Sequence, residues 1–146
     1  MQKISEEEII KILKENRFKV TPQRLAICKA VLSSTNHPSA EQVYENIKQK
    51  YPTISRATVY KTLSLLKEIG LISELRFNDT YTRYDPNISL HINIVCPVCL
   101  SIYDFKSEKL SNSWKSVISD IEGKIIGHRI DVYKICEKCE ENSSSR

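Results

Sequence analysis

Four of the five cysteines form two Cys-x-x-Cys pairs, Cys96 with Cys99 and Cys136 with Cys139. Each pair makes a short knuckle that directs two thiolates at one point, and two knuckles give a tetrahedral sulfur site that suits zinc. Because four cysteines fill the coordination sphere, we expect a structural site whose binding energy is folding energy. A redox dithiol is the alternative, but no βαβ pattern surrounds the pairs. Cys28 stands alone on an apolar helical face, and we interpret it as a core residue.

The chain has only three histidines, and two of them, together with two aspartates, are candidate ligands for a second metal ion. His91 precedes the first cysteine pair by five residues, Asp104 follows that pair, Asp85 ends the N-terminal half, and His37 lies beside Pro38. These ligands converge if the two halves of the chain fold onto each other. Imidazole and carboxylate with an open coordination position suit Fe(II), Mn(II) or Zn(II). Taken singly, each histidine is more commonly an ordinary surface or core residue.

A third group of residues has the chemistry of DNA recognition. The segment Ser55–Thr62 places Arg56 and Tyr60 four residues apart on one helical face, with Lys61 beside them. Arginine binds guanine edges or phosphate, lysine suits phosphate, and a tyrosine ring suits a thymine methyl group or the sugar backbone. The DNA-contact candidates are therefore Ser55, Arg56, Thr58, Tyr60 and Lys61, with Lys19, Gln23 and Arg24 at the flanking phosphates. The alternative is a solvated, mildly basic helix.

The elements that must carry these residues begin with four short helices. Their start signals are the capping box at Ser5, Thr21 followed by Pro22, the capping box at Ser39, and Ser55. Gly70 ends the fourth helix. Two strands then follow, Leu71–Phe77 and Tyr81–Tyr84, joined by a turn at residues 78–80. Helices followed by a β-hairpin predict a winged helix, whose last helix enters the major groove of DNA.

The C-terminal half has a different pattern. We expect strands at Ile92–Val95, Ile102–Phe105 and Ile125–Tyr133, and an amphipathic helix at Leu110–Ile121. A domain of about 55 residues is small for a self-sufficient core, so it needs a metal, a partner chain, or both. The expected organisation is a winged helix over residues 1–84, a hinge at 85–88, a dimerisation and zinc-binding domain at 89–140, and a disordered tail at 141–146. The fold class is α+β.

Charge and composition agree with a nucleic-acid partner without requiring one. Residues 1–85 carry 14 basic and 10 acidic side chains, whereas residues 86–146 carry 8 of each, so the N-terminal half is the better match for a polyanion. There is no apolar run of about 18 residues, which argues against a membrane-spanning helix. The polar, acidic N-terminus does not fit a secretory signal, so we expect a cytoplasmic location.

Several motifs together resemble the ferric uptake regulator (Fur) family, and within it most closely the peroxide-stress repressor (PerR) branch. The resemblance runs from about residue 5 to residue 140, and the motifs are Thr21-Pro22-Gln23-Arg24, His37-Pro38-Ser39-Ala40, Ser55–Tyr60, Tyr84-Asp85 and the two cysteine pairs. It implies a cytoplasmic homodimer with an N-terminal winged helix and a C-terminal α/β dimerisation domain. It also implies structural zinc at the four cysteines and a regulatory metal at His37, Asp85, His91 and Asp104.

Two positions depart from the family pattern. Asn93 stands where the family commonly has a histidine, and an amide oxygen is a weaker ligand than imidazole for a late transition metal. We therefore expect weaker regulatory metal binding or a changed metal preference, with Asn93 or water as a fifth ligand. Leu100 replaces a glycine that often follows the first cysteine pair.

The resulting hypothesis is a metal-dependent repressor that binds double-stranded operator DNA as a homodimer. The resemblance implies that peroxide sensing runs through Fe(II) chemistry at the site, by which peroxide oxidises a ligand histidine. Mn(II) is the other candidate for the regulatory metal. The alternative is a zinc-stapled DNA-binding regulator whose regulatory site is lost at Asn93. An enzyme is disfavoured, because no nucleophile constellation, general-base motif or phosphate loop is present.

Overall fold

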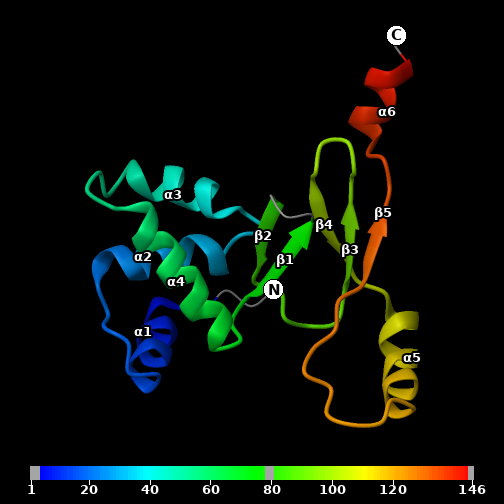
Figure 1. Cartoon of the computed structure of the whole chain (residues 1–146), viewed down its shortest axis with the longest axis horizontal. Coiled ribbons are helices and arrows are strands. Elements are labelled where there is room, and N and C mark those ends of the chain that lie inside the picture. Colours follow the sequence, from blue (N-terminus) through cyan, green and yellow to red (C-terminus); the bar gives the residue numbers. More distant parts are fainter. Residues whose placement is uncertain (1–3, 78–80, 145–146) are drawn as a thin grey trace. The chain divides into compact units, whose positions relative to one another are not determined.

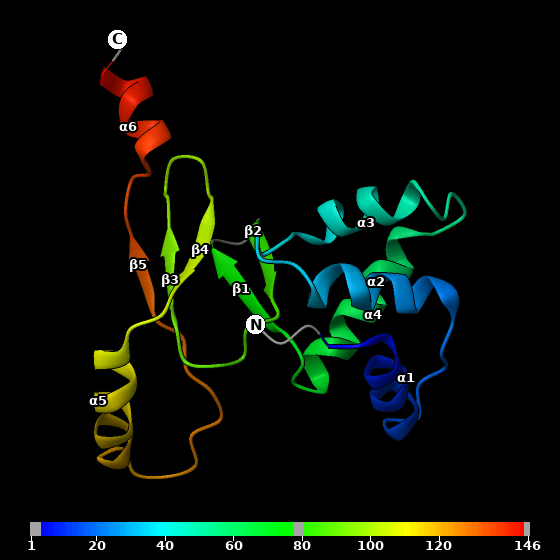
Figure 2. The same cartoon turned by 180° about the vertical axis from the view of Figure 1, so that it is seen from behind.

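The structure is a computed structural model that describes residues 4–77 and 81–144. The chain forms two compact units, Met1–Ile88 and Ser89–Arg146. Figures 1 and 2 show the elements of each unit from opposite sides. No helix in the described part of the chain is long and apolar enough to cross a membrane.

Unit 1 begins with the four helices that its capping residues predict. They are α1 (Glu6–Glu15), α2 (Pro22–Leu32), α3 (Ala40–Lys48) and α4 (Arg56–Glu68). The hydroxyls of Ser5, Thr21, Ser39 and Ser55 each accept a hydrogen bond from a backbone N–H in the first turn, and capping boxes form at Ser5 and Ser39. These bonds satisfy donors that a helix N-terminus otherwise leaves open, which is why local sequence fixes the starts.

The apolar faces of these helices meet in one core. Val59, Leu63 and Leu66 from α4 are fully buried, and Cys28 belongs to the same core, as expected from the sequence. Burial raises the pKa of the Cys28 thiol to about 11, so it stays protonated and unreactive at neutral pH. The rest of this core is Ile9, Leu13, Ile27, Val31, Leu32, Ala40, Val43, Tyr44, Ile47, Ile54, Leu65, Ile72 and Tyr84.

A β-hairpin follows α4 and completes the winged helix. Gly70 ends α4 with a φ of 74°, and Leu71 then donates a backbone hydrogen bond to the carbonyl of Leu66. Strands β1 (Ser73–Phe77) and β2 (Tyr81–Asp85) pair antiparallel. The sequence places the first strand two residues too early, and the turn it expects at 78–80 lies outside the described residues.

Unit 2 is built on a three-stranded sheet. Its strands are β3 (Ile92–Val95), β4 (Ile102–Phe105) and β5 (Asp131–Tyr133). The sheet has the order β4-β3-β5, with β4 antiparallel and β5 parallel to the central strand. The predicted strand over residues 125–133 is wrong in length: only its last three residues pair, because pairing with β3 begins at Asp131.

Two helices accompany this sheet, α5 (Glu108–Ser119) and α6 (Glu137–Ser144). Helix α5 lies beyond one end of the sheet rather than across its face (Figure 1), and it buries none of its residues. Helix α6 follows β5 beyond the opposite end and includes residues 141–144, which the sequence predicts to be disordered. The core of unit 2 is consequently small: Val95, Cys96 and Ile102 are its buried hydrophobic residues among those described.

Candidate metal centres and nucleic-acid interface

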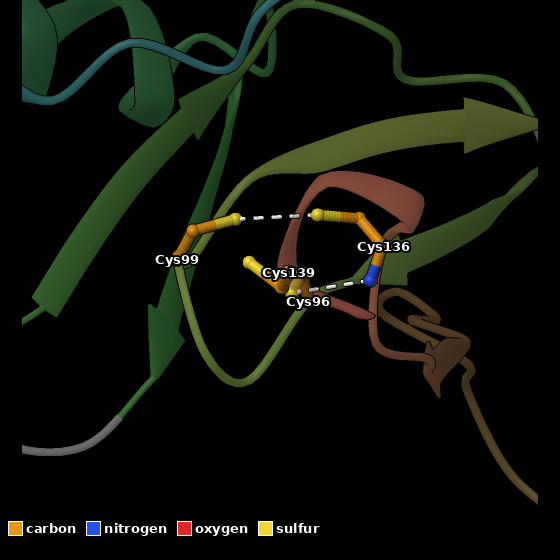
Figure 3. Close-up of side chains that lie close together, drawn as sticks. All are labelled: Cys96, Cys99, Cys136 and Cys139. Atoms are coloured by element: carbon orange, nitrogen blue, oxygen red, sulfur yellow. Dashed lines mark hydrogen bonds between the residues drawn. The ribbon is translucent and has the colours of Figure 1, made fainter. Parts of the chain in front are cut away.

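The four cysteines of the two Cys-x-x-Cys pairs come together in unit 2. Cys96 and Cys99 lie in the turn between β3 and β4, Cys136 precedes α6, and Cys139 lies in its first turn. Strand β5 runs parallel to β3, so residues that follow these two strands emerge at the same edge of the sheet. Figure 3 shows the four thiols directed at one another.

The geometry of the cluster fits a structural zinc ion. All four sulfur atoms lie within 4.8 Å of one another, and the Sγ atoms of Cys99 and Cys136 are 3.7 Å apart. A tetrahedron with Zn–S bonds of about 2.3 Å has sulfur–sulfur edges of about 3.8 Å. The backbone N–H of Cys136 points at the Sγ of Cys96 at 3.4 Å, as amides do around metal-bound thiolates. The four-cysteine cluster therefore matches the zinc site expected from the sequence.

The electrostatics of the cluster also favour a bound cation. Backbone N–H groups, first that of Cys99 and then that of Cys136, lower the pKa of Cys96 to about 6. The neighbouring Cys136 sulfur raises the pKa of Cys139 to about 12. The first thiolate therefore forms easily, whereas the last forms only against the negative charge already present. A divalent cation removes that repulsion, so zinc binding releases protons from the cluster.

The backbone of the first knuckle explains the position of Leu100. Its N–H donates to the carbonyl of Cys96 at 2.9 Å, and its φ is 59°. This left-handed conformation costs a residue with a Cβ about 1–2 kcal/mol, whereas glycine adopts it freely. The turn after the first cysteine pair thus favours glycine, and this chain maintains it with a strained leucine.

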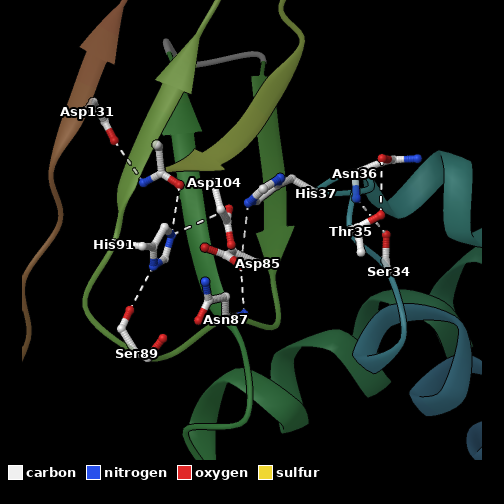
Figure 4. Close-up of polar contacts among 11 residues, drawn as sticks. Ser34, Thr35, Asn36, His37, Asp85, Asn87, Ser89, His91, Asp104 and Asp131 are labelled. Atoms are coloured by element: carbon white, nitrogen blue, oxygen red, sulfur yellow. Dashed lines mark hydrogen bonds and ion pairs between the residues drawn. The ribbon is translucent and has the colours of Figure 1, made fainter. Parts of the chain in front are cut away.

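Within unit 1, His37 and Asp85 form a close pair. The Nε2 of His37 lies 3.5 Å from an Oδ1 of Asp85, which also accepts a hydrogen bond from the N–H of Asn87 at 2.7 Å (Figure 4). The N–H of Tyr84 donates to the carbonyl of Pro38 and ties the loop before α3 to β2. His37 has a φ of 47°, a strained conformation of the kind found at binding sites.

Within unit 2, His91 lies beside two oxygen-bearing side chains. Its Nε2 is 3.7 Å from an Oδ1 of Asp104 on β4 and 3.1 Å from the Oδ1 of Asn93 on β3 (Figure 4). These are spacings of neighbouring ligands on one transition-metal ion. Each unit therefore carries a histidine–aspartate pair suited to metal binding, and in unit 2 an amide oxygen adjoins it.

The sequence provides no signal for two further residues of this cluster. Asp131 on β5 accepts a hydrogen bond from the Nδ2 of Asn93 at 3.1 Å. The guanidinium of Arg129 binds the same carboxylate, with distances of 2.9 and 2.6 Å. The pairing of β5 with β3 brings Asp131 next to Asn93, although the two residues are 38 positions apart.

On α4, the exposed face carries the residues expected to contact DNA. Tyr60 has 51 % of its surface exposed, and Lys61 is also exposed. Arg56 is exposed as well, but it already has partners: its Nε donates to Glu41 on α3 at 3.0 Å, and its guanidinium stacks over Tyr44, 4.2 Å from the ring centre. This contact also lowers the pKa of Glu41. Ser55 and Thr58 are used in capping the helix.

The three residues predicted at flanking phosphates lie around the start of α2. Lys19 is exposed, whereas Gln23 and Arg24 are partly buried. Arg24 donates to the carbonyl of Lys19, and Gln23 reaches Thr53 at 3.4 Å. Gln23 and Arg24 therefore brace unit 1 internally, and of the three Lys19 is the most exposed.

Comparisons with known proteins bear on this arrangement. Residues 15–133 match the model of the Ferric uptake regulator family. The chain is 34 % identical over 138 residues to the peroxide-responsive repressor PerR of Staphylococcus epidermidis, across 94 % of this chain and 92 % of that protein. It is 33 % identical over 135 residues to the PerR of Staphylococcus aureus, across 92 % and 91 % of the two chains.

Solved structures agree. The peroxide stress regulator of Campylobacter jejuni aligns with 36 % identity and a TM-score of 0.71, across 90 % of this chain and 99 % of that one. The ferric uptake regulator of Helicobacter pylori aligns with 26 % identity and a TM-score of 0.78, across 96 % and 97 %. The chain therefore belongs to the ferric uptake regulator family, whose members are metal-dependent transcriptional repressors.

Proposed function

We propose that this chain is a cytoplasmic repressor that binds operator DNA as a homodimer while a second metal ion occupies a regulatory site. The observation that carries this proposal is the histidine–aspartate pair in each compact unit, His37 with Asp85 and His91 with Asp104. A metal ion bound by both pairs joins the two units and fixes the angle between them. That angle sets the spacing of the DNA-binding helices in the dimer.

The donor atoms suit Fe(II) or Mn(II), which accept imidazole nitrogen together with carboxylate oxygen. Bound Fe(II) supplies the chemistry by which peroxide oxidises a ligand histidine, so loss of His37 or His91 as a ligand releases the metal. For the metal to regulate, it must bind the DNA-competent conformation better than the open one. A tenfold difference in metal affinity corresponds to about 1.4 kcal/mol of coupling to DNA binding.

DNA binding is supported by the exposed face of α4. Tyr60 and Lys61 are exposed on this helix, whereas Val59 and Leu63 are fully buried. The winged helix presents this face to a major groove. Arg56 joins the contact by exchanging the Glu41 carboxylate for a DNA phosphate or base, and Lys19 lies at the flanking phosphates.

Dimerisation through unit 2 is supported by the distribution of exposed apolar side chains. Ten of the twelve large hydrophobic residues exposed in the described part of the chain belong to unit 2, although it is the smaller unit. They include Val117 on α5 and Ile126, which is 94 % exposed. Apolar side chains exposed in such number on one small unit support a surface that another protein covers. A second copy of unit 2 supplies the core that a single copy lacks.

The experiment that tests the proposal measures metal content and DNA affinity together. The zinc-loaded protein is titrated with Mn(II) under anaerobic conditions, and its binding to a duplex selected from a random-sequence library is followed by fluorescence anisotropy. We expect one zinc and one manganese per chain, and tighter DNA binding with manganese. His37→Ala and His91→Ala should lose the manganese and the DNA response while they keep the zinc.

His128→Ala is the matched control, because His128 contacts the Trp114 ring and belongs to neither histidine–aspartate pair. It should behave like the parent protein. Equal DNA affinity with and without manganese would refute metal control. One zinc and no second metal would favour the alternative, a zinc-stapled DNA-binding protein whose regulatory site is disabled at Asn93.

A further inference from the structure

A chain of hydrogen bonds in unit 2 runs from Arg129 through Asp131 to Asn93 and His91. Figure 4 labels Asp131 and His91 of this chain. Arg129 contacts both carboxylate oxygens of Asp131, one through Nε and the other through Nη2. Asn93 lies opposite Asp131 in the register of β3 and β5. The backbone N–H of Asn93 also donates to the carbonyl of Ile130 at 2.8 Å, so main-chain and side-chain contacts hold the same residue.

The partners of Asn93 decide which way its amide faces. A carboxylate only accepts hydrogen bonds, so the amide group directed at Asp131 is the NH₂ donor. The Oδ1 of Asn93 therefore faces the Nε2 of His91 at 3.1 Å. A flipped amide would set its oxygen against the Asp131 carboxylate, which is an unfavourable contact between two acceptors.

The hydrogen-bond partner of Nδ1 decides, in the same way, which ring nitrogen of His91 carries the proton. Its Nδ1 lies 2.7 Å from the carbonyl of Ser89, which only accepts, so Nδ1 carries a proton. In the neutral ring the Nε2 lone pair then faces the lone pairs of Asn93 Oδ1. A proton or a metal cation beside both atoms makes this arrangement favourable. Two ligands at right angles with bonds of about 2.1 Å stand about 3.0 Å apart, close to the spacing observed.

We propose that the amide oxygen of Asn93 is a ligand of the regulatory metal, and that Asp131, held by Arg129, is the positioning residue that keeps this oxygen directed at the metal. The inference rests on the proposed regulatory site. On this proposal Asn93 takes the place of the family's histidine as a ligand. The site keeps five protein ligands, of which three are oxygens. Oxygen donors favour Mn(II) over softer ions, so the substitution changes metal selectivity rather than disabling the site.

The test is a direct Mn(II) binding titration of the zinc-loaded, full-length protein, in which free Mn(II) is measured by its electron paramagnetic resonance signal. Asn93→Ala should raise the Kd for Mn(II) by about tenfold or more. Asp131→Asn allows the amide of residue 93 to turn over, and it should also raise the Kd about tenfold, within the range found for residues that orient metal ligands. Asp120→Asn makes the same charge change at the exposed end of α5 and should have no effect.

The double variant Asn93→Ala with Asp131→Asn separates positioning from a general loss of negative charge. If Asp131 acts through Asn93, its replacement should change the Kd by less than about twofold once the amide is gone. Additive effects of the two substitutions would overturn the positioning role, and normal Mn(II) affinity of Asn93→Ala would overturn the ligand assignment. Zinc content and circular dichroism check that each variant folds; if Asp131→Asn does not fold, Arg129→Ala tests the same orientation.

Selectivity gives an independent readout. Asn93→His should raise affinity for Co(II) more than affinity for Mn(II), because imidazole replaces an oxygen donor. An equal gain for both ions would contradict the selectivity argument. Absence of a second Mn(II) site in the parent protein would refute the proposed function itself, whereas a site that requires His91 but not Asn93 would refute only this inference.

Discussion

Removal of zinc should unfold unit 2 and leave unit 1 intact. The described residues of unit 2 bury only Val95, Cys96 and Ile102 as hydrophobic core, whereas the core of unit 1 draws on four helices and the hairpin. The four cysteines connect the β3–β4 turn to the start of α6. The perturbation is Cys139→Ser, or treatment of the parent protein with a strong zinc chelator.

The magnitudes decide the outcome. Burial of Val95 and Ile102 contributes about 1.5–3 kcal/mol each. A structural zinc ion contributes about 10–16 kcal/mol in small metal-dependent domains, more than the entire net stability of many proteins. Loss of the zinc therefore exceeds what the core of unit 2 supplies. The described residues of unit 1 contribute no ligand to the four-cysteine cluster, and the buried Cys28 lies outside it.

One tryptophan makes the two units separable in an assay. Trp114 is the sole tryptophan in the sequence, and it lies on α5, half-buried, with its ring 5.5 Å from that of His128. Its fluorescence emission reports on unit 2, while far-ultraviolet circular dichroism is dominated by the helices of unit 1. On zinc removal the emission should shift to longer wavelength, and most of the helical signal should remain with its own thermal transition.

Cys28→Ala is the control, because it removes a thiol without touching the metal site. It should keep one zinc per chain and native Trp114 emission, although it destabilises unit 1. The reasoning is refuted if the zinc-free protein retains native tryptophan emission. It is equally refuted if both units unfold in a single transition when the zinc is removed.

Three further perturbations test separate parts of the structure. Glu41→Gln removes the nearest carboxylate partner of Arg56, which keeps Glu45 at 3.7 Å, and it removes a negative charge near DNA. Affinity for a duplex in fluorescence anisotropy should therefore rise about threefold to tenfold at low salt, and unchanged affinity would mean that Arg56 only braces α3 against α4. Val117→Glu places a charge on the exposed apolar face of α5 and should shift sedimentation velocity toward monomer, whereas the neighbouring Ser116→Glu, on the opposite face, should not. Gly70→Ala should lower the free energy of unfolding of unit 1 by about 1 kcal/mol in chemical denaturation, because its φ of 74° strains a Cβ even though no atom lies within 4 Å of it; a gain in stability would contradict this account.

Local signals let the sequence predict much of unit 1. A capping serine and the N–H groups it satisfies lie within three residues of each other, so Ser39 specifies the start of α3 without reference to the rest of the fold. Gly70 marks the end of α4 for a similar reason, because the left-handed φ that ends the helix is a property of this one residue. The two cysteine pairs indicate zinc because neighbouring residues form each Cys-x-x-Cys turn. The two turns lie next to each other only because β5 runs parallel to β3.

Contacts between residues far apart in the chain were decided by the tertiary structure. Periodicity predicts a strand from residue 125, but a strand exists only where a neighbour supplies hydrogen bonds, and β3 supplies them from Asp131. Arg56 is a plausible base-reading residue in the sequence, yet packing of α3 against α4 gives it Glu41 as a partner. From the sequence alone, position 93 shows only that the family's usual histidine is replaced by asparagine. The register that sets Asp131 opposite it fixes the direction of its amide, because the orientation of a polar side chain depends on partners that only folding provides.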